Sequence, residues 1–133
     1  MNNYIPVALI LITLMSVQSV EAADKAPPAK DTVVLQRVPV PGTGWEMGMG
    51  IAEFPPNSAK PRQQAAGPEV CYVREGEVMV QIAGQPTRTF HAGETFQLPA
   101  NVVHVTTAGP VGAVVVATWA HMPGKQFNIP VPN

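Results

Sequence analysis

The sequence predicts an all-β fold in which a closed antiparallel sheet forms one domain. In Val78, Val80 and Ile82 the apolar side chains fall on every second residue, the period of a strand with one buried face. Short runs of this kind are separated by segments rich in Gly and Pro, among them EGE, AGQP, HAGE and LPAN, which are typical of tight turns. No helical periodicity of useful length is present, and fifteen prolines and eleven glycines agree with short strands.

Residues 1–22 are predicted to be a secretory signal peptide. The apolar run IPVALILITLM is shorter than the roughly 18 residues that a membrane-spanning helix needs. Val20 and Ala22 are small residues where signal peptidase requires them, so we expect cleavage after Ala22. The mature protein would then be periplasmic or secreted, without a membrane anchor. Retention of the segment as an N-terminal anchor is the alternative.

The mature chain is expected to begin with a flexible leader, residues 23–31, because ADKAPPAKD is polar and carries prolines. A single barrel domain follows over residues 32–133. TVVLQRV is its first expected strand, and WEMGMGIAEF is the second. In the second strand small residues alternate with four bulky ones that we expect to face the core: Trp45, Met47, Met49 and Ile51.

The loop PPNSAKPRQQAAGP precedes the central stretch from Glu69 to His104. Its two cations and two amides either face the mouth of the barrel and bind a polar or anionic ligand, or form a solvated loop. Beyond His104 we expect two strands around an AGPVG turn. One face of the second comprises Val115, Ala117, Trp119 and His121. The proline-rich tail is expected to drape over the barrel without forming a strand.

The composition limits the classes of binding partner that we expect. A formal net charge of −1 with 13% charged residues gives no electrostatic reason to expect nucleic acid binding.

The single cysteine, Cys71, has no partner for an intramolecular disulfide in an oxidising compartment. It should share a strand face with Glu69, either as a soft ligand or reactive thiol or, as we favour, as a small buried apolar residue.

The central stretch resembles the two sequence motifs of the cupin superfamily. The spacing of Glu69 and Gly76, with six residues between them, is similar to the second half of the first motif. The second motif is matched by Gly93 and Pro99, with five residues between them, and by His104, five positions after Pro99. The resemblance extends from about Asp31 to the C-terminus and is greatest to small secreted single-domain cupins. It implies an antiparallel jelly-roll β-barrel and a homodimer.

The departures from the cupin pattern concern the metal site. Metal-binding cupins usually carry a His-x-His pair six and four residues before the Glu, where this chain has Gln63 and Ala65. The usual Gly after the second-motif Pro is Asn101, and the final Asn is Ala108. The resemblance therefore implies a degenerate metal site. Its candidate metal ligands are Glu69, His104 and, more weakly, Gln63.

Iron, manganese, zinc, nickel and copper are the divalent metals that such a set would take, and the site can equally lack a metal. With or without one, the candidate ligand-binding residues are Gln63, Glu69, Cys71 and His104. His91 precedes Gly93 in a turn and is expected in solvent. His121 is a less favoured candidate for an additional residue of the site.

Three functions fit these residues. We favour a secreted single-domain cupin with a partly lost metal site that binds a small molecule or is non-catalytic. The first alternative is a metal-dependent oxidoreductase or isomerase that uses Glu69 and His104. The second is a structural or interaction module in which the barrel is a scaffold.

Overall fold

A computed structural model describes residues 26–133, so the predicted signal peptide lies outside the described residues. All regular structure between these limits is β, which confirms the predicted fold class. No helix in this part of the chain is long and apolar enough to cross a membrane. The strands are β1 Val33–Pro39, β2 Glu46–Phe54, β3 Gln63–Ala65, β4 Glu69–Ile82, β5 Arg88–His91, β6 Thr95–Leu98, β7 His104–His121 and β8 Asn128–Pro130.

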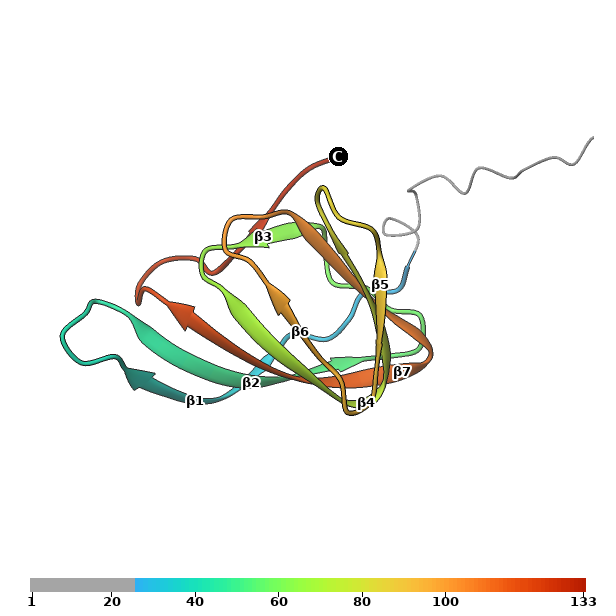
Figure 1. Cartoon of the computed structure of the whole chain (residues 1–133), viewed down its shortest axis with the longest axis horizontal. Helices are drawn as coiled ribbons and strands as arrows, with labels where there is room; N and C mark the ends of the chain where they lie inside the picture. Colours follow the sequence, from blue (N-terminus) through green and yellow to red (C-terminus); the bar gives the residue numbers. More distant parts are fainter. Residues whose placement is uncertain (1–25) are drawn as a thin grey trace, which may run out of the picture.

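The strands form one curled antiparallel sheet, the predicted jelly-roll barrel (Figure 1). β7 is its centre, because β2 pairs with its second half and β4 pairs with it along nearly its whole length. β1 extends the sheet beyond β2, while β5 and β6 pair with β4. β3 lies between β7 and the short C-terminal β8.

Two segments that we expected to be turns lie inside strands. EGE belongs to the 14-residue β4, and AGPVG belongs to the 18-residue β7. The two irregularities face each other: a Cβ on Gly76 would lie 2.0 Å from the Gly112 carbonyl oxygen, and both glycines have positive φ. Only glycine fits such a close approach, so the two strands bend together and curl the sheet instead of ending.

The expected orientation of β2 was wrong. Met47 and Met49 are 53% and 42% exposed, whereas Gly48 and Gly50 are buried. The reason is Trp119 on β7, whose indole lies against the glycines: a Cβ on Gly48 would lie 2.3 Å from Trp119 Cε2. The small side of β2 therefore faces inward to accommodate a large side chain from the neighbouring strand.

Both ends of the described chain are attached to the barrel. Ala29, in the expected leader, donates its backbone N–H to the Ala59 carbonyl at 2.9 Å and packs against the core. At the other end the tail forms β8, which the sequence did not predict, through three-residue pairing with β3. Arg62 holds the tail further by donating from Nη1 to the Pro132 carbonyl at 2.7 Å.

Candidate functional site

The inner side of the curled sheet encloses a cavity of about 440 Å³. Its size lies within the range of small-molecule sites, about 300–1,000 Å³. The four candidate residues that the sequence pointed to all line it: Gln63, Glu69, Cys71 and His104.

Strand pairing explains this convergence. Gln63 on β3 is the register partner of His104 on β7, so the two side chains project to the same side of the sheet. Glu69 opens β4, where it pairs with Trp119, and Cys71 follows two residues later on the same face. Residues 41 positions apart in the sequence thus meet across one antiparallel sheet.

His104 is almost fully buried, and its two ring nitrogens have different surroundings. Nδ1 lies 3.3 Å from the Val102 carbonyl, which assigns the ring proton to that nitrogen and makes Nε2 the acceptor. Burial lowers the pKa of His104, and the Val102 carbonyl opposes this only in part. His104 therefore presents a neutral imidazole at neutral pH.

Glu69 contributes a carboxyl group to the cavity wall. Burial raises its pKa to about 7, while the Lys60 ammonium acts in the opposite direction. Near neutral pH this side chain is consequently a mixture of carboxylic acid and carboxylate, able either to donate or to accept a hydrogen bond.

Cys71 is a free thiol and only 3% exposed. Burial raises its pKa, and the neighbouring Glu69 carboxylate raises it further. Because the thiolate is the nucleophile and the metal ligand, this environment favours Cys71 as a small apolar residue of the cavity wall.

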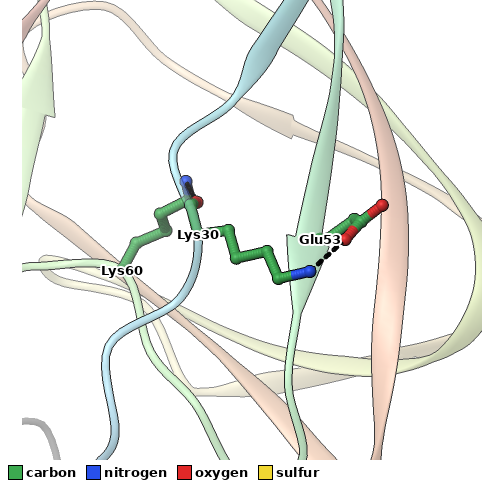
Figure 2. Close-up of polar contacts among 3 residues, drawn as sticks. All are labelled: Lys30, Glu53 and Lys60. Atoms are coloured by element: carbon green, nitrogen blue, oxygen red, sulfur yellow. Dashed lines mark hydrogen bonds and ion pairs between the residues drawn. The ribbon is translucent and has the colours of Figure 1, made fainter.

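Lys60 supplies a half-buried amine to the cavity wall. Its Nζ donates to the Lys30 carbonyl and lies 3.5 Å from Thr32 Oγ1. In Figure 2 the Lys60 side chain reaches the Lys30 backbone, while the Lys30 side chain points away to Glu53 at 2.6 Å. Burial lowers the pKa of Lys60, and the negative charges of Asp31 and Glu69 oppose that shift.

The two cations and two amides of residues 60–64 do not act as one set. Lys60 and Gln63 line the cavity, whereas Arg62 holds the C-terminal tail. Gln64, the next residue along β3, pairs with Ile129 of β8 and is not a lining residue.

Several lining residues could not be inferred as site residues from motifs. Phe127, Asn128 and Pro130 come from the tail, and Asp31 from the N-terminal segment, neither of which has a distinctive pattern. Phe127 closes one side by packing on Trp119 and edge-on against His121, with ring centroids 6.0 and 5.2 Å apart.

His121 also lines the cavity, with its Nε2 2.7 Å from the Lys125 carbonyl. His91, in contrast, lies outside the site and is exposed, as the turn chemistry predicted. Its Nδ1 lies 3.2 Å from a Glu77 carboxylate oxygen.

The donor set does not fit a tightly held metal ion. Glu69 and His104 are two strong donors, whereas Gln63, whose Nε2 donates to Asn128 Oδ1 at 3.3 Å, offers only a neutral amide oxygen. Ala65 has no donor atom, and no group of three His, Cys, Asp or Glu within residues 26–133 is placed to hold an ion. A metal here would need further ligands from a bound molecule.

Comparison with known proteins identifies related folds. A family model described as "Cupin domain" matches residues 50–118, about half of the chain. No curated protein matches the sequence significantly.

Among solved structures, oxalate oxidase in complex with glycolate is 27% identical with a TM-score of 0.51, covering 55% of this chain and 41% of that one. The DMSP lyase DddQ from Ruegeria pomeroyi DSS-3 is 16% identical (TM-score 0.59), with 64% and 43% covered. An RmlC-like cupin from Shewanella frigidimarina is 20% identical (TM-score 0.53), with 71% and 87% covered. The last two likenesses concern the fold alone, and the matched segment spans less than half the length of the first two proteins.

Proposed function

Because the chain belongs to the cupin family, we propose that it binds a small organic acid in the barrel cavity, without a tightly held metal ion. The observation that carries the proposal is the Lys60 amine in the wall of an otherwise largely apolar cavity that also holds Glu69 and His104. The charged groups and the apolar walls of the cavity support this class of ligand.

The surroundings of Lys60 favour an anionic ligand. Lys60 makes no ion pair with a carboxylate of residues 26–133, and its hydrogen-bond partners are neutral oxygens. A half-buried ammonium is stabilised by an anionic partner, and a ligand carboxylate would supply one. The raised pKa of Glu69 reduces the negative charge that would repel such a ligand.

The remaining polar groups favour a hydroxy or carbonyl function next to the carboxylate. His104 offers a neutral imidazole and Glu69 an acid that donates when protonated. Phe54, Phe96, Leu98 and Trp119 provide apolar walls against the rest of the ligand. The glycolate complex of oxalate oxidase shows that a related barrel takes a small hydroxy acid, which supports this class of ligand.

Isothermal titration calorimetry with glycolate tests the proposal, and glycolamide serves as its uncharged counterpart. We expect glycolate to bind more tightly than glycolamide, and Lys60→Met to weaken glycolate binding about tenfold, or ~1.4 kcal/mol. Lys125→Met is the matched control, because Lys125 is exposed and does not line the cavity. Equal binding of acid and amide, or an equal effect of the two lysine variants, would contradict the proposal.

The second candidate is a metal-dependent cupin enzyme in which Glu69 and His104 hold the ion. The likeness to oxalate oxidase favours it, as does the Nε2 acceptor of His104 in the cavity. Elemental analysis of the purified protein separates the two candidates.

A further inference from the structure

A second hollow lies between β5 and β6, apart from the barrel cavity. Its volume is about 620 Å³, which is within the range of small-molecule sites, and we call it the β5–β6 cleft. Its lining residues come from β4, β5, β6 and the segments next to these strands. Phe96 is the one residue that lines both hollows. The cleft is therefore separate from the site described above.

The cleft exists because two strands share β4 as their partner. β5 pairs with residues 77–80 of β4 and β6 pairs with residues 69–72, and in the described sheet neither pairs with the other. The turn that joins them is fixed to β4, since Gly93 donates its backbone N–H to the Val73 carbonyl at 2.8 Å. Away from this turn the two strands diverge (Figure 1), and a wedge-shaped gap opens between them.

The inner part of the cleft is apolar. Its buried lining residues are Val80, Phe90 and Phe96, and the two phenyl rings lie with their centroids 5.1 Å apart. Closer to the surface the lining includes Ile82, which is half-buried, and Val70, which is 58% exposed. These side chains provide walls against which a ligand ring can pack.

The charged residue of the lining is Arg88. It is the register partner of Val80, two residues from Phe90, so its side chain projects to the same side of β5 as that ring. Its guanidinium carbon lies 5.0 Å from the Phe90 ring centroid, and the residue is exposed. The positive charge is thus held at the entrance to the apolar part of the cleft.

Arg88 is available to an anionic ligand. The ion pairs within residues 26–133 do not include it. The acids near the β5–β6 turn have other partners: Glu94 Oε1 accepts the His91 backbone N–H at 3.0 Å, and a Glu77 carboxylate oxygen lies 3.2 Å from His91 Nδ1. The lining itself contains no acidic residue. A carboxylate in the cleft would meet a cation and no opposing negative charge.

Backbone hydrogen bonds hold the entrance in place. In the segment between β4 and β5, Ala83 donates its N–H to the Val103 carbonyl at 2.9 Å, and Gln85 donates to the Ile82 carbonyl at 3.0 Å. Gln85 also lines the cleft, as do Thr95 and Gln97 on β6, and their side chains can hydrogen-bond to a ligand. The cleft is therefore preformed, which reduces the entropic cost of binding.

We propose that the β5–β6 cleft binds an aromatic carboxylate, with the carboxylate on the Arg88 guanidinium and the ring between the apolar walls. The planar guanidinium fork matches the geometry of a carboxylate, and it also stacks on aromatic rings. The proposal does not depend on what the barrel cavity binds, because Arg88 has no part in that site.

Isothermal titration calorimetry with 2-naphthoate, at up to about 5 mM because ligands of this size bind at millimolar concentration or below, tests the proposal. We expect 2-naphthoate to bind more tightly than the uncharged 2-naphthamide, and Arg88→Met to weaken binding of the acid about tenfold. Nuclear magnetic resonance of the parent protein locates the site independently of any variant, and we expect 2-naphthoate to shift the Arg88 Nε–H signal.

Arg74→Met is the matched control, since Arg74 is an exposed arginine of β4 that does not line the cleft. We expect it to leave 2-naphthoate binding unchanged. The proposal would be overturned by absence of binding, by equal affinities for acid and amide, or by equal effects of the two arginine variants. Resonance shifts confined to residues of the barrel cavity would overturn it as well.

Discussion

The two sides of the sheet at β2 show opposite relations between side-chain size and burial. On the inner side Gly48, Gly50 and Ala52 are small and buried. On the outer side Met47 and Met49 are large and exposed. The alternation has the expected period of two, but its direction is the reverse of a typical half-buried strand.

The inner side of β2 therefore leaves space for a large side chain of the neighbouring strand instead of filling the core itself. Trp119, one residue of the neighbouring strand, occupies the room over Gly48 and Gly50 and forms part of the cavity wall. The large residues of β2, in contrast, lie on the outer side and are exposed. Three predictions test this contrast, in order of decreasing effect.

Gly48→Val should produce the largest effect, because its side chain would displace the Trp119 indole. We expect a loss of at least about 3 kcal/mol in the free energy of unfolding, at the upper end of overpacking costs. Gly44→Val is the control, since no atom lies within 4 Å of a Cβ there. Urea denaturation followed by tryptophan fluorescence measures both, and equal losses would refute the packing argument.

Glu69→Gln should stabilise the protein in a pH-dependent way. The raised folded pKa of Glu69 means that the folded state binds more protons than the unfolded state between pH 4.5 and about 7, so stability falls as pH rises through this window. Above it the variant should gain about 3 kcal/mol, and near pH 4 almost nothing. Urea denaturation as a function of pH provides the measurement.

Glu53→Gln is the outer-side control for the same experiment. Lys30 lowers the pKa of Glu53, so its contribution is present above its unfolded pKa and is lost on acidification. The two variants should therefore shift the pH dependence in opposite directions. A Glu69→Gln variant that is equally stable relative to the parent at all pH values would contradict the buried-carboxyl account.

Gln63→His should have the smallest effect of the three, about a tenfold gain in Zn²⁺ affinity. It adds a third strong donor next to Glu69 and His104, because Gln63 is the register partner of His104. Gln64→His, on the neighbouring β3 position that does not line the cavity, is the matched control. Competition with a chromogenic chelator measures both affinities, and an equal gain would show that the assigned face of β3 is wrong.

Strand periodicity and the spaced motifs predicted the parts of the fold that depend on local sequence. Val78 and Val80 are buried as their alternation indicated. Asn101, which replaces the family's usual glycine, has a φ of 60°, so the asparagine retains the left-handed turn. The motif residues Glu69 and His104 line one cavity.

The other parts of the fold and of the candidate site depend on contacts between residues that are far apart in the sequence. The orientation of β2 is set by Trp119, about 70 positions away in the sequence, and Gly76 remains within a strand because Gly112 lies opposite. Of the cavity residues from the tail, Asn128 is positioned by pairing with β3, and Phe127 accepts the backbone N–H of Ala66 at 2.7 Å. Such contacts carry no periodic signal in their own segments.

Glu69 and His104 alone are too few strong donors for a resident metal in the cavity. Elemental analysis of the protein, purified without chelator or affinity tag, tests this directly beside a Glu69→Ala, His104→Ala double variant. We predict metal well below one equivalent, at most about 0.1, in both proteins. About one equivalent of iron, manganese, zinc, nickel or copper in the parent, lost in the double variant, would contradict the claim and favour the metal-dependent enzyme.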